Sequence, residues 1–138
     1  MLDTSVLVAA FQSARGASRQ VLIAALQNRF DLLLSVPLIL EYESVLTRPG
    51  HLALSGVTSK DVEAVLDDLA SVAVPVRVSF RWRPLLPDAN DDMVLETAVN
   101  GNARGIATFD RRHFGSVTRA FAIEVISPAD VLNRLRRM

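Results

Sequence analysis

The feature that most constrains the fold is an alternation of short apolar runs with longer segments of helical periodicity. Apolar runs occur at 1–8, where the run meets an Asp-Thr-Ser step, and at 30–34, 72–78, 105–108 and 121–126. Between them, apolar residues recur at helical spacing over 15–28, 36–46, 58–69, 91–100 and 128–135. Strands that alternate with helices are typical of an α/β fold with a mainly parallel sheet. We therefore expect a three-layer α/β/α sandwich.

Local chemistry sharpens several element boundaries. Ser35, followed by Pro37, provides a capping oxygen and then a ring that fixes φ in the first turn of a helix. Thr58 and Asp61 suggest a second capped start, and Ser127-Pro128 is expected to open the last helix. Arg48-Pro49-Gly50 is expected to end the helix over 36–46. Pro75 cannot donate a ladder hydrogen bond, which favours an edge position for its strand.

Composition limits the possible functions. With 138 residues, half of them apolar, the chain suits one domain spanning 1–138. Fifteen basic and fifteen acidic residues cancel, so any nucleic-acid contact must come from local clustering. There is no cysteine and there are only two histidines, which argues against disulfides, thiolate catalysis and zinc clusters. No apolar run approaches the ~20 residues of a membrane span, so we expect a soluble cytoplasmic protein.

Acidic residues stand where this topology would bring them together. Asp3 and Asp110 each follow an expected strand, and the carboxyl ends of parallel strands share one edge. Asp91 lies in the first turn of the helix before the Asp110 strand. Glu41 interrupts an apolar stretch of the second helix, although a rotation of that helix would present Glu43 instead. The four acids are expected to converge at one rim of the sheet.

Each acid also has an ordinary interpretation. Asp91 or Asp92 in a first helical turn complements the helix dipole, and Asp110 suits a turn after a strand. The joint pattern of four acids is what favours a site, since the only lysine, Lys60, is far in sequence from all of them. Without a lysine, phosphoryl transfer to an aspartate is a poor alternative.

The acids lie within four motifs. These are Leu2-Asp3-Thr4-Ser5-Val6-Leu7, Ser35-x5-Glu41-x3-Val45-Leu46, Asp88-x2-Asp91-Asp92-x2-Leu95-x2-Ala98 and Ala107-Thr108-Phe109-Asp110. In order and spacing they resemble the motifs of PIN-domain nucleases, and are most similar to the toxin components of VapC-type toxin–antitoxin pairs. Ser5 departs from the asparagine usual in the family. The abrupt start at Met1 is a second departure, and a native start upstream of Met1 stays open.

The resemblance implies a metal-dependent ribonuclease. Asp3, Glu41, Asp91 and Asp110 would bind Mg²⁺ or Mn²⁺ and serve catalysis, because hard divalent ions prefer carboxylate oxygens. Ser5 and Thr108, with the flanking acids Asp88 and Asp92, would support this cluster.

The resemblance also implies partners. RNA would be the substrate, a small antitoxin would bind the acidic cleft, and the protein would form a homodimer. Four arginines follow the first and last motifs and would contact phosphates: Arg15, Arg19, Arg111 and Arg112. The alternative is a catalytically inert PIN-like module that binds RNA or protein.

Overall fold

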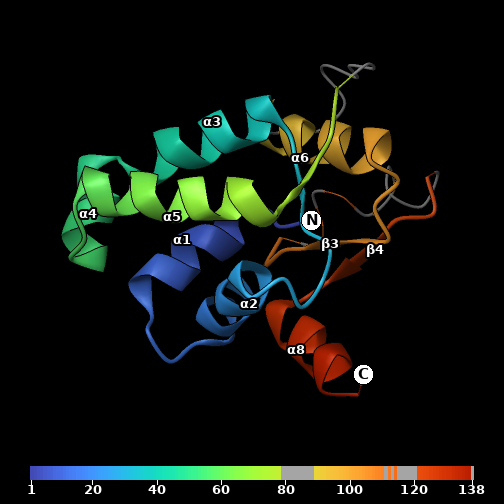
Figure 1. Cartoon of the computed structure of the whole chain (residues 1–138), viewed down its shortest axis with the longest axis horizontal. Helices are drawn as coiled ribbons and strands as arrows, with labels where there is room; N and C mark the ends of the chain where they lie inside the picture. The colour runs from blue at the N-terminus through green and yellow to red at the C-terminus, as the bar shows by residue number, and fades with distance from the viewer. Residues whose placement is uncertain (79–88, 111, 113, 115–120, 138) are drawn as a thin grey trace.

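The computed structural model describes residues 1–78, 89–110, 112, 114 and 121–137, and within the helix that begins at Ala89 the described side chains start at Met93. The helices are α1 (Thr4–Gln12), α2 (Ala17–Leu26), α3 (Val36–Leu46), α4 (Pro49–Ser55), α5 (Ser59–Val72), α6 (Ala89–Asn100) and α8 (Pro128–Arg136). The strands are β1 (Leu33–Leu34), β2 (Val74–Pro75), β3 (Gly105–Ala107) and β4 (Glu124–Ile126). Figure 1 shows α1, α3, α4 and α5 on one side and β3, β4 and α8 on the other.

The strand pairs that the structure describes are all parallel. β1 pairs with β2, and β3 pairs with β4. Leu2 forms a further parallel bridge with Ala107, supported by hydrogen bonds from the Ala107 amide to Met1 (3.0 Å) and from the Asp3 amide to Ala107 (2.9 Å). The segment before Asp3 therefore runs alongside β3, and β3 has β4 on its other side. The carboxyl ends of all three face one edge.

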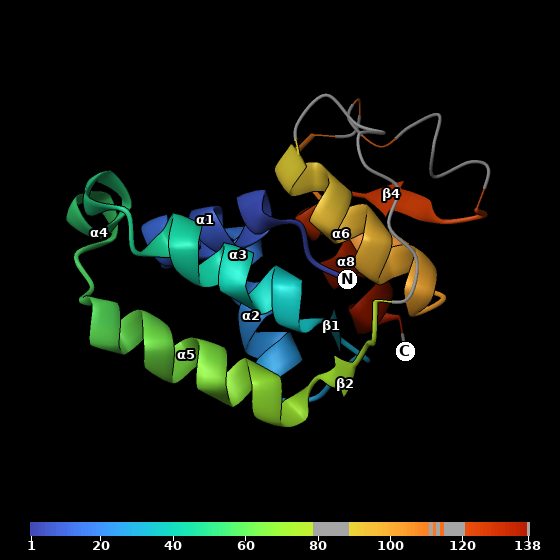
Figure 2. The ribbon, with the colours of Figure 1, turned by 90° about the horizontal axis from the view of Figure 1, so that it is seen from above.

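The structure contains more helix and shorter strands than the expected three-layer α/β/α sandwich would have. The strands described are two or three residues long, whereas α5 alone has 14 residues. Figure 2 shows α3 lying between α1 and α5, with α6 beside its first turns, and α3 contacts all three of these helices. One buried hydrophobic cluster joins these helices to β3 through residues such as Leu7, Leu38, Leu69, Leu95 and Ile106. An α/β architecture is present, and the three-layer arrangement remains a prediction.

Three helix starts follow the capping chemistry expected from the sequence. Ser35 Oγ accepts from the Leu38 amide at 3.3 Å, which caps α3. Thr58 and Asp61 form a reciprocal capping box at the start of α5. Ser127 Oγ accepts from the Asp130 amide at 3.2 Å and caps α8. Side-chain oxygens thus satisfy amides that a helix start leaves without a partner.

Two helices were not predicted from the sequence. The strand expected before Asp3 is present as the Leu2 bridge, but the loop expected after Asp3 is replaced by α1, which begins at Thr4 and buries Val6, Leu7, Ala10 and Phe11 as a helical stripe. Helix α3 ends before Arg48, as expected, but Pro49 is also the first residue of α4, where a proline is well tolerated since that position needs no amide donor.

In the described ranges, no helix is long and apolar enough to span a bilayer.

Candidate functional site

Asp3 is a buried carboxylate held in place by two hydroxyl groups. It is only 4% exposed and occupies the N-cap position of α1, yet its side chain makes no capping hydrogen bond. Ser5 Oγ donates to Asp3 Oδ2 at 2.7 Å, and Thr108 Oγ1 donates to the same oxygen at 2.6 Å. These short bonds orient the carboxylate, and neither of them uses Oδ1.

Thr108 joins Asp3 to the chain around Asp110. Its side chain is fully buried, and its amide donates to Ile126 of β4 at 3.0 Å. While the hydroxyl donates to Asp3, it accepts a hydrogen bond from the Asp110 amide at 2.9 Å. One threonine therefore fixes the relative positions of two acidic residues that are far apart in the sequence. The Asp110 residue itself is exposed to solvent.

Helix α3 turns Glu41 inward and Glu43 outward. Glu41 is half-buried and its Oε1 atom is shielded from solvent, whereas Glu43 is exposed. The next residue, Tyr42, is completely buried, and its hydroxyl donates to the carbonyl of Leu2. Burial, followed by the nearby charge of Asp3, raises the pKa of Tyr42 well above its usual value. The tyrosine thus ties α3 to the segment that carries Asp3.

Helix α6 is joined to α3 by a buried pair of hydroxyls. Ser35 Oγ and Thr97 Oγ1 lie 2.6 Å apart. Because Thr97 Oγ1 donates its proton to the carbonyl of Met93 at 2.8 Å, Ser35 must be the donor between the two. The start of α3 is therefore hydrogen-bonded to the helix whose first turn contains Asp91. The side chains of Asp91 and Asp92, and the whole of Asp88 and Arg111, lie outside the described residues.

Residues 1–112 match the family model of the PIN domain. The chain belongs to the PIN-domain family. No curated protein and no solved structure matches it. The match includes Asp3, Glu41, Asp91 and Asp110, and it supports an α/β fold and a nuclease-type function.

The donor set of this PIN domain suits a hard cation. Asp3, Asp110 and Glu41 offer carboxylate oxygens, the ligands that Mg²⁺ and Mn²⁺ prefer. Among side chains that the structure describes, no three acidic or histidine residues lie close enough together to form a metal cage. Asp91, the remaining acid that the motif resemblance implies, lies in the first turn of α6, and its side chain is outside the described residues.

The predicted phosphate contacts of the PIN domain are placed unequally. Arg15 is exposed beyond the far end of α1, and nine helical residues span about 13 Å from the Asp3 end. Arg19 Nε donates to the carbonyl of Ala10 at 2.5 Å, which joins α2 to α1. Arg112 is exposed two residues after Asp110. Three of the four arginines predicted to contact phosphate are described, and of these Arg112 is nearest in sequence to an acid of the site.

Glu96 is a buried acid that the sequence analysis did not assign. It is 2% exposed, lies in α6 between buried Leu95 and Thr97, and its carbonyl accepts from Asn100 Nδ2 at 2.7 Å. The sequence signal that could have identified Glu96 is its place within the largely apolar stretch 93–99. A carboxylate is costly to bury unless it has a partner, so an acid in such a stretch deserves a functional interpretation.

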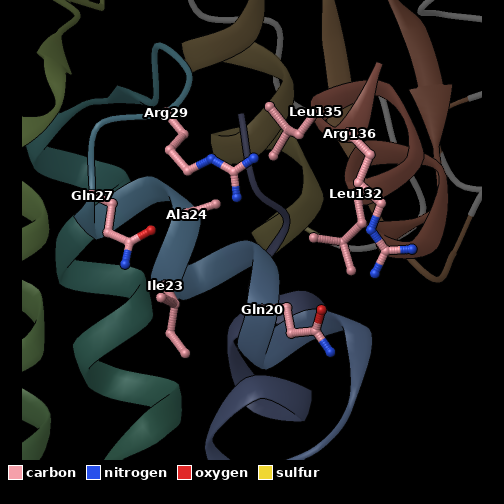
Figure 3. A pocket seen from close by; sticks show the side chains of 8 residues that line it. All are labelled: Gln20, Ile23, Ala24, Gln27, Arg29, Leu132, Leu135 and Arg136. Carbon is pink, nitrogen blue, oxygen red and sulfur yellow. The ribbon is translucent and has the colours of Figure 1, made fainter. Parts of the chain in front are cut away.

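The cavity between α2 and α8 is separate from the acids. It has a volume of about 200 Å³ and is lined by Gln20, Ile23, Ala24, Gln27, Arg29, Leu132, Leu135 and Arg136 (Figure 3). Gln27 and Arg29 precede β1, and Leu135 and Arg136 are at the far end of the helix that follows β4. Of the acids whose side chains the structure describes, none lines this cavity, so it is distinct from the surroundings of Asp3.

Proposed function

We propose that this PIN domain is a ribonuclease that depends on Mg²⁺ or Mn²⁺. The observation that carries the proposal is the buried Asp3 carboxylate, oriented by Ser5 and Thr108, with Thr108 also linking it to Asp110. Two donors on Asp3 Oδ2 leave Oδ1 for another ligand. Such a buried carboxylate, aligned by hydroxyls at the carboxyl edge of a parallel sheet, is suited to binding and chemistry.

The residues of the chain have separate tasks in this proposal. Asp3, Glu41, Asp91 and Asp110 hold the cation, which when bound neutralises phosphoryl oxygens and activates water. Ser5 and Thr108 keep Asp3 in one rotamer, and Tyr42 keeps α3 against the Asp3 segment. Phosphodiester hydrolysis by this arrangement is expected to leave a 5′-phosphate.

The motif resemblance supports a finer proposal. The chain would act as the toxin of a toxin–antitoxin pair in the cytoplasm, restrained by a small antitoxin protein, and would function as a homodimer. Exposed apolar residues on α3, Val36 (70% exposed) and Leu40 (58% exposed), are compatible with contact to another protein chain near Glu41.

Cleavage of RNA by purified protein tests the proposal. Wild type is expected to cut single-stranded RNA with Mn²⁺ and to be inactive with EDTA, and Asp91→Asn is expected to lose at least about 100-fold in rate. Asp67→Asn, which changes an exposed acid on α5, is the matched control and should retain full activity. Equal cleavage in EDTA, or full activity of Asp91→Asn, would overturn the mechanism. Absence of Mn²⁺ binding by calorimetry would favour an inert PIN-like module.

Expression in cells addresses the toxin role. Induction of wild type is expected to arrest growth, with new RNA ends appearing, whereas induction of Asp91→Asn should cause neither effect. Normal growth despite active enzyme in the extract would separate ribonuclease activity from a toxin role.

A further inference from the structure

Phe109 is an exposed aromatic residue placed between two residues of the candidate site. Its neighbours are Thr108, which is fully buried, and Asp110. Its own side chain is 57% exposed, whereas Phe114, five residues later, is completely buried. A phenylalanine whose ring is more than half exposed forgoes much of the free energy that burial of the ring would supply. Phe109 directly precedes Asp110 in the sequence and lies two residues after the carboxyl end of β3.

The backbone around Phe109 is held on both sides. The amide of Thr108 donates to Ile126 at 3.0 Å, and the amide of Asp110 donates to Thr108 Oγ1 at 2.9 Å. The hydroxyl that accepts this second bond also holds Asp3. The ring is therefore attached to a backbone whose position is coupled to the acids, and a phenylalanine has only two side-chain torsions to order on binding.

The net charge of the protein is zero, so long-range electrostatic attraction alone would contribute little to its affinity for RNA. Basic and acidic residues are equal in number, and a cluster of carboxylates repels phosphates until a cation is bound. Stacking of a base on an aromatic ring depends little on base identity or on net charge. An exposed aromatic ring next to Asp110 in the sequence would thus add attraction to that of the arginines.

We propose that Phe109 stacks on a nucleobase of the RNA strand, next to the phosphate that the acids engage. This inference rests on the proposed ribonuclease function. Stacking requires an unpaired base, because the face of a base is accessible in a single strand and covered in a duplex, which agrees with the single-stranded RNA of the proposed function. The presence of a base at the stacked position is expected to matter more than its identity.

A second exposed phenylalanine provides a matched control. Phe121 is 38% exposed and precedes β4, whose first residue, Glu124, pairs with Gly105 at the start of β3. Phe121 thus lies toward the amino ends of the same two strands from which Phe109 departs at the carboxyl end. Phe121 lines a second cavity, distinct from the one between α2 and α8, together with Ala98 and Arg104. Removal of its ring should leave RNA cleavage unchanged.

The test combines variants of Phe109 with RNA that lacks single bases. A short single-stranded RNA cut by wild type is synthesised as a series in which one nucleotide at a time is replaced by an abasic ribose. For wild type, we expect one position near the cleaved bond at which the abasic substitution slows cleavage by about 5- to 150-fold, the equivalent of 1–3 kcal/mol. Phe109→Ala should cut intact RNA slower by a similar factor and show no further loss at that position.

Conservative variants separate stacking from apolar bulk. Phe109→Tyr should keep the abasic sensitivity of wild type, whereas Phe109→Leu should behave as Phe109→Ala. Phe121→Ala should show the wild-type profile. An unchanged abasic profile in Phe109→Ala, with cleavage intact, would overturn the stacking role alone. Failure of wild type to cut any RNA would overturn the proposed function, and this inference with it.

Discussion

At the scale of single residues, Thr108 is the side chain on which the geometry of the site depends most. Its hydroxyl both donates to Asp3 and accepts from the Asp110 amide. Thr108→Val preserves shape but removes both bonds, so one buried acceptor loses a donor and one amide loses its acceptor. We expect stability to fall by about 1–3 kcal/mol and the rate of RNA cleavage to fall about 10- to 100-fold. Chemical denaturation and cleavage assays measure the two effects.

Two further threonine variants separate the hydroxyl of Thr108 from general stability. Thr108→Ser retains the hydroxyl and should recover most of the activity. Thr47→Val removes a hydroxyl whose bond, 2.7 Å to the carbonyl of Glu43, is internal to the end of α3. It should leave cleavage unchanged. Wild-type activity in folded Thr108→Val would show that the bridge has no part in the reaction.

Tyr42 gives a pH-dependent prediction. Its pKa is raised by burial and then by Asp3, so the folded state holds the phenolic proton more tightly than the unfolded state does. This contribution to stability is fully present below the ordinary pKa of about 10 and is lost as pH rises above it. We expect the absorbance of tyrosinate to appear only together with alkaline unfolding. Tyr42 is the only tyrosine, so the signal needs no deconvolution.

Tyr42→Phe removes the titrating group and should flatten the alkaline loss of stability, although it also removes the hydrogen bond to Leu2 and lowers stability near neutral pH. Tyrosinate that forms near pH 10 in protein still folded by circular dichroism would contradict the raised pKa.

At the scale of elements, the sequence predicted helix starts better than strands. Ser35, Thr58 and Ser127 cap helices through contacts only three residues away, so local chemistry is enough. The length of a strand depends on partners that are distant in sequence. The strands expected over 30–34 and 72–78 are only two residues long each, as β1 and β2. The apolar residues after Asp3 are compatible with either a strand or a helix. They form helix α1, which buries Val6 and Leu7.

The candidate site was predictable in outline and not in its hydrogen bonds. Topology indicated that Asp3 and Asp110 each follow a strand at the same edge of the sheet, and the structure shows that these strands are neighbours. The bond from Thr108 to Asp3 joins residues 105 positions apart, a contact for which periodicity carries no signal. The sequence left Glu41 and Glu43 open because helical rotation depends on packing. Burial of Leu38, Tyr42 and Val45 sets that rotation, with Glu41 half-buried. A role for Glu41 as a metal ligand stays a prediction.

The hydroxyl pair between α3 and α6 is expected to set the relative position of two helices that carry acids. Ser35→Ala removes both the α3 cap and the bond to Thr97, and Thr97→Val removes the bond alone. We expect each to weaken Mn²⁺ binding about 10-fold or more, because Glu41 and Asp91 would no longer be held in register. Calorimetric titration with Mn²⁺ measures this effect.

Thr58→Ala is the control, because it removes a helix cap without affecting the hydrogen bond that joins α3 to α6. Thr58 caps α5 in an exposed capping box, and its removal should cost about 1 kcal/mol of stability, as a cap does in general. Its Mn²⁺ affinity should equal that of wild type. Equal affinity in Thr97→Val would mean that packing alone positions the two helices.

At the scale of the whole molecule, the proposed cation site gives a prediction for stability. If Asp3, Glu41, Asp91 and Asp110 share a cation, their mutual repulsion is relieved, and a ligand that binds only the folded state stabilises it by mass action. Mn²⁺ at 100 times its dissociation constant should therefore add about 2.7 kcal/mol to the free energy of unfolding. Thermal unfolding of the metal-free protein with increasing Mn²⁺ tests this, and EDTA should reverse the shift.

Two exposed acids make this test specific. Asp110→Asn removes a proposed ligand with little cost to packing, since Asp110 is exposed, and should abolish most of the Mn²⁺-induced rise in melting temperature. Asp67→Asn, on α5, should keep the full Mn²⁺ shift. An equal shift in both variants would mean that Mn²⁺ stabilises the protein without using Asp110.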